Sequence, residues 1–351
     1  QHLKNEGYTT ISNNKITHLK NDIDEWDEEW YPDENGFRNY ISEENIRLEE
    51  NDEHGYAYEN IDVKDDAYND GKTANKSIED LKKLKKEGNP FFLAVGFVKP
   101  HLPFNAPKKY WDLYDAEKIE LPKNSVFPKS APRKANHKWG ELRYYNQVPK
   151  EGQVSETMAK KLIHGYYASV SYVDAQIGKV INAIDHLGLR DNTVIVLVGD
   201  HGWSLMEHGL WVKHSNFEVA LQVPLIVSAT NIPKNKKTNS IAELVDLYPS
   251  ICDLINISKP KHLEGDSFIE ALENPLGNYK NTALARYLRG ETLIADNYFY
   301  TEWRKKGKTI AKMLYDHKID LDENRNLVLE SEYNHIVDSL SILLNQKILK
   351  N

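Results

Sequence analysis

The fold of this chain is decided by the stretch Val194-Ile195-Val196-Leu197-Val198-Gly199-Asp200-His201-Gly202-Trp203. It opens with a run of apolar, mostly β-branched residues, a pattern that predicts a buried strand. In open α/β sheets, ligands bind beyond the carboxyl ends of the strands. A carboxylate beside an imidazole at such an end favours a site for a divalent cation. Asp200 and His201 alone would equally suit a polar loop that caps the next helix. Residues 207–217 add Lys213 and further histidines, which favours the functional interpretation.

The composition limits the classes of protein to which the chain belongs. Its 351 residues suffice for one large domain with a smaller appendage. Lys and Arg number 45 against 53 Asp and Glu, and the net charge of −8 argues against general nucleic-acid binding. The single cysteine, Cys252, has apolar neighbours at helical spacing and is expected to be a small buried hydrophobe. No apolar run is long enough to predict a membrane span.

Helices and strands alternate along most of the chain, which predicts an α/β fold. From about residue 276 the pattern changes to short alternating runs, which predict a small antiparallel sheet closed by a terminal helix. We therefore expect an α/β domain over residues 1–275 and a subdomain over residues 276–351. The expected strands of the α/β domain are 9–12, 91–98, 194–198 and 224–227, and 91–98 and 194–198 are expected to be fully buried.

Three helices are expected in the α/β domain. The longest follows an N-cap at Ser155 and closes at Gly188, with Val170 on its apolar stripe. A second begins at Ser77, where Asp80 would complete a capping box, and runs to residue 84. The third covers residues 241–255.

In two stretches the apolar residues do not recur at the spacing of a helix or a strand. Residues 20–70 are acidic and aromatic and predict a solvated loop, although their Trp and Tyr side chains could instead stack on sugar rings at the rim of a pocket. Residues 105–153 are rich in Pro and Lys and predict an irregular surface segment that shapes specificity.

Polar residues follow three of the predicted strands: Asn14-Lys15-Ile16-Thr17-His18, Lys99-Pro100-His101, and Asp200-His201 with Lys213. Together they offer a pair of metal ligands, several cations, and imidazoles that move protons. Such a set stabilises a tetrahedral oxyanion with several non-bridging oxygens and protonates a leaving alkoxide. Esters of sulfate and of phosphate both fit this description. Lys15 and His18 alone would suit an ordinary polar turn.

Five stretches, taken in order, carry a resemblance to a known family: 91–104 (FFLAVGFVKPHLPF), 164–177 (HGYYASVSYVDAQI), 199–203 (GDHGW), 207–217 (EHGLWVKHSNF) and 314–327 (LYDHKIDLDENRNL). On them the chain resembles the type I, formylglycine-dependent sulfatases, and within these the iduronate-2-sulfatase-like branch. The resemblance runs through nearly the whole chain. It implies the alkaline-phosphatase/sulfatase-like α/β fold, a mixed sheet between helices with a small C-terminal subdomain that contains an antiparallel sheet.

The resemblance also implies roles for individual residues. Asp200 and His201 would bind Ca²⁺, with Mg²⁺ as the alternative cation. Lys15 would contact both the nucleophile and the sulfate. His18 would hydrogen-bond the hydroxyl of the nucleophile and later deprotonate it to release sulfate.

Further roles concern the sugar. His101 would be the general acid for the leaving sugar oxygen. Lys213 would bridge a sulfate oxygen and this leaving oxygen. The residues that would bind or support the rest of the substrate are Lys99, Trp203 and His208.

The chain departs from the family pattern in two ways. Asn14 stands where the family usually has Gly before the first Lys, but Asn tolerates a left-handed backbone, so we expect the turn to survive. The nucleophile motif, Cys or Ser followed by x-Pro-x-Arg, and the paired Asp metal ligands are absent from the chain. We expect an N-terminal segment of the same protein, upstream of Gln1, to supply both, including the formylglycine.

The function implied by the resemblance is hydrolysis of sulfate esters on sugars of an anionic polysaccharide or glycosaminoglycan. The sulfated oligo- or polysaccharide would carry a uronate 2-O-sulfate or be an algal polymer such as ulvan. The alternatives are a metal-dependent phosphohydrolase of the same superfamily and a non-catalytic relative that binds sulfated glycans. Because such polymers are too large to enter the cytoplasm, we expect a periplasmic or secreted protein.

Overall fold

The structure, a computed structural model, describes residues 1–17, 25–32, 37–51, 53–277 and 279–350. The chain divides into two compact units. Unit 1 comprises residues 1–121 and 141–191, and unit 2 comprises residues 122–140 and 192–351. The boundary expected near residue 276 lies within unit 2, and the division of the chain into domains stays a prediction.

The helices and strands of unit 1 are α1 (His2–Asn5), β1 (Thr9–Asn14), β2 (Glu28–Trp30), α2 (Glu43–Glu50), β3 (Tyr58–Glu59), α3 (Asn69–Glu87), β4 (Phe91–Gly96), β5 (Phe104–Asn105), α4 (Lys108–Trp111) and α6 (Glu156–His186). The short helix α5 (Gly140–Arg143) crosses the division of the chain, because Gly140 belongs to unit 2 and the rest of the helix to unit 1. Those of unit 2 are β6 (Ile195–Val198), β7 (Ser204–Leu205), β8 (Trp211–Val212), α7 (Glu218–Leu221), β9 (Leu225–Ser228), α8 (Leu247–Leu254), α9 (Ile269–Glu273), β10 (Thr282–Tyr287), β11 (Gly290–Ala295), β12 (Tyr298–Lys305), β13 (Lys308–Asp316) and α10 (Asn334–Lys350).

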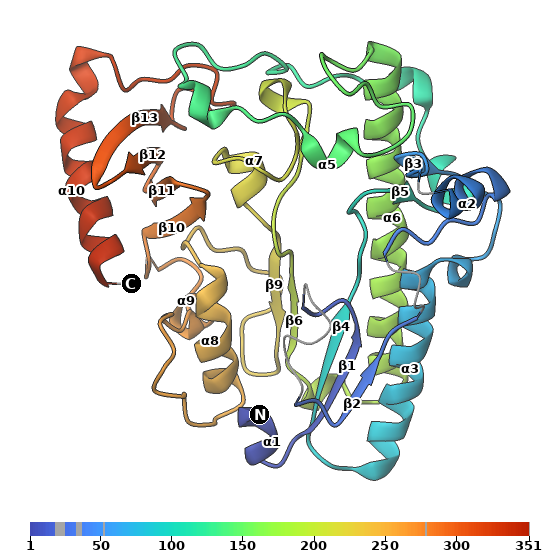
Figure 1. The fold of residues 1–351 in the computed structure, drawn as a ribbon. Coiled ribbons are helices and arrows are strands. Elements are labelled where there is room, and N and C mark those ends of the chain that lie inside the picture. Colours follow the sequence, from blue (N-terminus) through green and yellow to red (C-terminus); the bar gives the residue numbers. More distant parts are fainter. Residues whose placement is uncertain (18–24, 33–36, 52, 278, 351) are drawn as a thin grey trace. The chain divides into compact units, whose positions relative to one another are not determined.

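Unit 1 is built on a parallel sheet of order β2-β1-β4. Its central strand β1 pairs with β4 from Thr9↔Phe91 to Asn14↔Gly96. Helix α3 packs against β1 and β4, and α6 packs along α3 (Figure 1). The strands expected at 9–12 and 91–98 are thus confirmed. The expectation that the second is fully buried is wrong: β4 is half-buried, and among the described residues it lies at the edge of the sheet, with β1 as its neighbour.

Strand β1 is buried although most of its side chains are polar. The amide of Asn13 donates to Ser77 Oγ at 3.1 Å and to Asp80 Oδ2 at 2.8 Å. The amide of Asn14 donates to Thr73 Oγ1 at 3.0 Å. These bonds offset the cost of burying the amides. The expected capping box at Ser77 and Asp80 is therefore wrong: α3 begins well before Ser77, and both side chains face β1 from within the helix. The helix runs three residues past the expected end at residue 84, and the left-handed residue Gly88 ends it.

Strands β1 and β4 end next to each other. A Cβ atom on Gly96 would lie 2.1 Å from the carbonyl oxygen of Lys15. Only glycine lets the turn after β1 pass so close to the end of β4. Lys15 and the loop that carries His101 therefore start from neighbouring points at one edge of the sheet.

The long helix expected after Ser155 is confirmed as α6, with Ser155 as its N-cap. The expected apolar stripe is largely confirmed, since Leu162, Val173, Val180 and Ile184 are buried. Val170 is the exception: it is 39% exposed, whereas Ala168 is fully buried. Small residues occupy this face since the helix lies close to its neighbours. A Cβ atom on Gly165 would come within 2.8 Å of the ring of Trp111.

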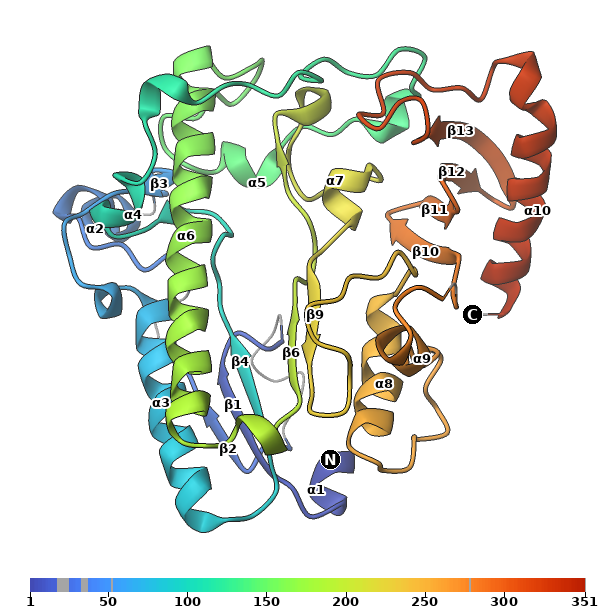
Figure 2. The same cartoon turned by 180° about the vertical axis from the view of Figure 1, so that it is seen from behind.

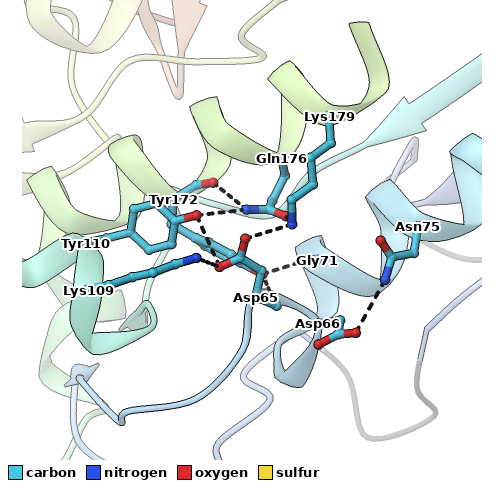
Figure 3. Close-up of polar contacts among 9 residues, drawn as sticks. All are labelled: Asp65, Asp66, Gly71, Asn75, Lys109, Tyr110, Tyr172, Gln176 and Lys179. Carbon is cyan, nitrogen blue, oxygen red and sulfur yellow. Dashed lines mark hydrogen bonds and ion pairs between the residues drawn. The ribbon is translucent and has the colours of Figure 1, made fainter. Parts of the chain in front are cut away.

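Helices α4 and α6 are joined through the carboxylate of Asp65, which lies in a 3-10 turn just before α3 (Figure 3). Lys109 and Lys179 each approach this carboxylate at 2.7 Å. Burial by itself raises the pKa of Asp65, but the two ammonium groups outweigh burial and lower the pKa to about 2. The hydroxyl of Tyr172 donates to the Asp65 carbonyl and accepts from the N–H of Gly71, so it ties the start of α3 to α6.

The stretch 20–70 is not the continuous solvated loop that its composition predicts. Its described part contains β2, α2 and β3. The ring of Trp26 stacks on Phe92, with centroids 5.7 Å apart. The buried carboxylate of Glu59 accepts from the backbone N–H groups of Ile41 and Ser42. Packing and buried hydrogen bonds thus order a segment whose sequence shows no period. In contrast, 105–153 is mostly irregular, as expected.

Unit 2 contains a four-stranded antiparallel sheet of order β10-β11-β12-β13, on which α10 packs (Figure 2). The buried side chains between them include Leu293, Tyr300, Leu314 and Leu344. The antiparallel sheet and terminal helix expected after residue 276 are confirmed. The helix expected at 241–255 is shorter, because a 3-10 turn over Leu244–Asp246 precedes α8.

Strands β6 and β9 of unit 2 pair antiparallel, from Ile195↔Ser228 to Val198↔Leu225. Both expected strands are confirmed. The expected full burial of β6 is wrong, and Val198 is 40% exposed. Among the described residues, β9 is the one strand that pairs with β6, and no described strand pairs with the other edge of β6. None of the described helices is both long and apolar enough to cross a membrane.

Glu302 of β12 supports a pH prediction. Its side chain is 1% exposed and accepts from Ser341 of α10, Tyr300, Arg304 and Thr309. Burial raises the pKa of Glu302, but these hydrogen bonds lower it to about 2. Because the pKa of Glu302 is lower in the folded protein than in the unfolded chain, its ionised form stabilises the folded state. This stabilisation is present above the unfolded pKa near 4.5 and is lost as the pH falls toward 2.

The unfolding free energy of the wild type should fall between pH 5 and pH 2. In Glu302→Gln this fall should be smaller by about 3 kcal/mol. Urea unfolding at several pH values measures this difference. Glu273→Gln, on the exposed face of α9, is the control and should unfold with the wild-type pH dependence. Equal pH slopes for Glu302→Gln and the wild type would contradict the prediction.

Candidate active-site residues

Lys15 follows β1 in a turn that begins with a left-handed residue. Asn14 has a φ of 64°, so asparagine does adopt the backbone that glycine would otherwise provide. Its side chain is bound to Thr73 of α3, and its carbonyl accepts from the N–H of Ile16. The turn is thereby fixed from two sides. His18, the other predicted residue of this turn, lies outside the described residues.

His101 lies in the loop after β4, between cis peptide bonds at Lys99-Pro100 and Leu102-Pro103. Its side chain is 12% exposed, and the ring of Phe37 meets it edge-on at 5.6 Å. Nδ1 lies 2.8 Å from the carbonyl oxygen of Leu102, and Nε2 lies 2.8 Å from the carboxylate of Glu141. The imidazole is thus held in one orientation.

Lys99 is buried and holds the same loop together. Its ammonium group donates to the carbonyl oxygen of Pro103. Burial lowers the pKa of Lys99 to about 8, and the charges of Asp70 and Glu59 act in the opposite direction. The carboxylate of Asp70 accepts from the N–H groups of Val98 and Lys99, each at 2.9 Å. These contacts are supporting ones, and a contact between Lys99 and substrate stays a prediction.

In unit 2, the structure brings together His201, Trp203 and Lys213. The ammonium group of Lys213 lies 5.3 Å from the centre of the Trp203 ring, and the His201 ring lies 6.0 Å from the same ring. Pairing of β7 with β8 explains this arrangement, since Ser204 is opposite Val212 and the residues just outside this pair are Trp203 and Lys213. The cation–π contact holds the ammonium group in place.

The loop between β6 and β7 is fixed by α7. The N–H of Gly202 donates to Ala220, and that of Trp203 donates to Val219. A Cβ atom on Gly202 would lie 2.1 Å from the Val219 carbonyl oxygen. Glycine is required here because the backbone approaches α7 so closely.

Asp200 and His201 fit one part of a cation site. The Asp200 side chain is 81% exposed, and its Oδ2 lies 3.7 Å from Nε2 of His201. Nδ1 of His201 lies 2.9 Å from the carbonyl oxygen of Gly202, which only accepts. A neutral imidazole therefore carries its proton on Nδ1 and its lone pair on Nε2, as metal-binding histidines commonly do. The described residues contain no group of three or more His, Cys, Asp and Glu placed to hold a metal.

His208 is placed apart from this cluster. Its side chain is 3% exposed and packs on Phe217, with ring centroids 4.1 Å apart. Nε2 lies 3.7 Å from the carboxylate of Glu323. These are the contacts of a core residue, and its predicted position beside a bound sugar stays a prediction.

Sequence reasoning missed Glu141, and it missed the pairing of His137 with His214. The ring centroids of these two histidines lie 6.2 Å apart. His214 directly follows Lys213 in the sequence. Burial, and secondly the charge of His214, lowers the pKa of His137 to about 4, so His137 is neutral at pH 7. Both Glu141 and His137 lie in the irregular stretch 105–153, where no periodic signal marks which side chains meet.

No residue of the described chain fits the formylglycine that the resemblance implies. The one cysteine, Cys252, is fully buried in α8, as its apolar neighbours predict. A nucleophile must reach its substrate, and a fully buried thiol in a helix does not.

Family models match both parts of the chain. One described as "Sulfatase" matches residues 1–257, and one described as "N-sulphoglucosamine sulphohydrolase, C-terminal" matches residues 206–350. Iduronate 2-sulfatase of Mus musculus is 31% identical over 307 residues, which cover 76% of this chain and 56% of the relative. The ulvan-active sulfatase of Formosa agariphila is 27% identical over 279 residues, which cover 76% and 50%. The chain thus spans about half the length of the curated relatives it matches.

Solved structures share the fold at low identity. One is a protein in complex with its substrate D-glucosamine-2-N,6-O-disulfate, with a TM-score of 0.76 and 19% identity over 99% of this chain and 81% of that chain. Another is the phosphonate monoester hydrolase of Agrobacterium radiobacter, with a TM-score of 0.73 and 18% identity over 99% and 79%. The expected alkaline-phosphatase/sulfatase-like α/β fold is thereby confirmed.

Proposed function

The chain belongs to the sulfatase family, and from this premise we propose that the protein hydrolyses sulfate esters on sugars of an anionic polysaccharide or glycosaminoglycan. The observation that carries the proposal is the arrangement in unit 2 of the Lys213 ammonium group, the Trp203 ring and the His201 imidazole. A fixed ammonium group beside a possible cation site suits a group with several anionic oxygens. An aromatic ring at the same place suits the face of a sugar.

The proposed roles follow the chemistry of each side chain. Lys213 and Lys15 bind sulfate oxygens and neutralise their charge. His101 gives its proton to the sugar oxygen as the bond to sulfur breaks. Asp200 and His201 would hold a calcium ion, with Mg²⁺ as the alternative. When bound, this ion would supply further positive charge to the sulfate. His18 would assist the nucleophile.

The proposed reaction needs a nucleophile, and the nucleophile motif of the family is absent from this sequence. Because Cys252 is buried and lacks the motif of the family, we propose that a formylglycine outside the sequence attacks sulfur. Reading the gene around the coding region tests this point. A Cys or Ser followed by x-Pro-x-Arg supports the enzyme, and an intact reading frame without one supports a non-catalytic glycan-binding relative.

The proposed substrate is a uronate 2-O-sulfate or an algal polymer such as ulvan. Support comes from the similarity to an iduronate 2-sulfatase and to an ulvan-active sulfatase. Polymers of this size do not enter the cytoplasm, so we propose that the protein acts in the periplasm or outside the cell. Fractionation of the producing cells, followed by immunoblotting, tests this location.

The activity is tested by offering the complete protein a panel of substrates. The panel contains 2-O-sulfated heparan and dermatan oligosaccharides, ulvan and carrageenan oligosaccharides, and a phosphate and a phosphonate monoester. Ion chromatography measures free sulfate and phosphate. We expect sulfate release from at least one sugar sulfate, and its loss when chelator removes the cation. Release from the phosphorus esters alone would replace the proposal with a phosphohydrolase.

A further inference from the structure

Residues 122–138 form a cationic strip in a chain that is acidic as a whole. The strip contains five Lys and Arg residues and no Asp or Glu, whereas the whole chain carries a net charge of −8. All five cationic side chains are exposed: Lys123, Lys129, Arg133, Lys134 and Lys138. An acidic protein repels an anionic polymer, so its attraction to such a polymer must come from a local cluster of cations.

The backbone of the cationic strip is bound to the loop that follows β13. The N–H of Lys129 donates to the carbonyl oxygen of Asn324 at 2.8 Å, and the N–H of Asn326 donates to that of Lys129 at 2.9 Å. The side-chain amide of Asn326, which is 1% exposed, donates to the carbonyl oxygen of Ser130 at 3.0 Å. A backbone that is fixed in advance lowers the entropy cost of binding a ligand along it.

The C-terminal end of the cationic strip lies beside the residue that follows Lys213. The ring centroids of His137 and His214 are 6.2 Å apart, and the N–H of Trp139 donates to Nδ1 of His137. Three residues of chain span at most about 11 Å, so Lys134 lies within this reach of His137. All these residues belong to unit 2. The strip therefore leads toward the place where the reacting sulfate is proposed to bind.

The cations near this end are available for an anionic ligand. In the described part of the chain, neither Arg133 nor Lys134 forms an ion pair with a carboxylate. Two carboxylates of the supporting loop have partners within that loop. Asp320 accepts from the N–H of Arg325 at 2.9 Å, and Glu330 pairs with the guanidinium group of the same residue.

We propose that the cationic strip binds the part of an anionic polysaccharide that extends beyond the reacting sugar, through the sulfate and carboxylate groups of that part. The inference rests on the proposed function, because it takes Lys213 as the point where the reacting sulfate binds. Arg133 and Lys134, in a 3-10 turn, bind anionic groups near the reacting sugar, and Lys129 binds farther along the polymer. Single exposed ion pairs are weak, so the strip favours a long chain that contacts several cations at once.

The double variant Arg133→Gln/Lys134→Gln in the complete protein tests this site. A disaccharide and a dodecasaccharide are prepared from the polysaccharide that the protein desulfates. For the dodecasaccharide, loss of two ion pairs should raise KM about 10-fold and leave kcat unchanged. For the disaccharide, both constants should change less than ~2-fold, because it is too short to reach the strip. The difference between the two substrates should shrink at high salt, which screens exposed charges.

Two control variants accompany it. Lys236→Gln/Lys237→Gln removes two adjacent exposed cations from the loop after β9 in the same unit, and it should keep the wild-type constants. Arg133→Lys/Lys134→Arg keeps both charges and should keep most of the preference for the dodecasaccharide. Equal effects of the two glutamine variants overturn the inference, as does an equal loss on the two substrates.

A second measurement does not depend on activity. Calorimetric titration of the complete protein uses heparin and ulvan dodecasaccharides, and single-stranded DNA as a polyanion of another class. The wild type and the Lys236→Gln/Lys237→Gln control should bind a dodecasaccharide about 10-fold more tightly than Arg133→Gln/Lys134→Gln does.

Equal affinities of the wild type and Arg133→Gln/Lys134→Gln for both glycans, or no binding of either, overturn the inference. Tighter binding of DNA than of either glycan, lost in the same variant, would assign the strip to nucleic acid instead. A wild type that releases no sulfate from any substrate contradicts the proposed function, and the titration still decides the role of the strip.

Discussion

Lys213→Ala is expected to lower kcat/KM for a sugar sulfate by at least ~10²-fold, the loss typical of removing one preorganised charged donor. The ammonium group is held over the Trp203 ring, so it is in place before substrate binds. Alanine removes the charge that balances the sulfate oxygens. Sulfate release under initial-rate conditions measures the effect.

Two comparisons give this result its meaning. Lys236→Ala removes an exposed lysine from the same unit and should leave the rate unchanged. Lys213→Arg keeps the charge and the contact with Trp203 but changes the shape of the donor, so an intermediate loss is expected. A near-normal rate for Lys213→Ala, with an unchanged melting temperature, would remove the assigned role.

His101→Ala should show a loss that depends on the leaving group. For a sugar sulfate, turnover should fall by at least ~10²-fold, because an alkoxide is a poor leaving group without a proton. For 4-nitrophenyl sulfate the loss should be much smaller. The ratio of the two losses reports general-acid catalysis and is insensitive to damage that affects every substrate alike.

The matched control for this variant is His186→Ala, at the exposed end of α6. It removes an imidazole from the same unit and should leave both substrates unaffected. Equal losses of His101→Ala on both substrates would place His101 in binding or in folding rather than in proton transfer.

The sequence predicted the strands near the candidate site because each is a short apolar run with clear ends. The run Phe91 to Gly96 is followed by Pro residues, and the run Ile195 to Val198 is followed by Gly199. Such local signals give the type and the end of an element. They do not give its burial, which depends on how many strands flank it, and both strands proved half-buried.

Failures of the prediction have one physical origin. Ser77 and Asp80 match a capping pattern locally, but their partner is Asn13, 64 and 67 residues away along the chain. Glu141 meets His101 from an irregular stretch. Contacts between side chains far apart in sequence leave no trace in spacing, so polar partners of this kind become visible only in the fold.

The polar side chains of β1 have a consequence for the position of Lys15. A slip by one residue turns every side chain of a strand to the opposite face of the sheet. In β1 the side chains that would turn also make directional hydrogen bonds to α3. A one-residue slip would turn Asn13 and Asn14 away from α3, and it would leave several amide and hydroxyl groups without partners inside the protein. The strand that leads to Lys15 is therefore locked to a single alignment, and the lysine emerges at one defined point.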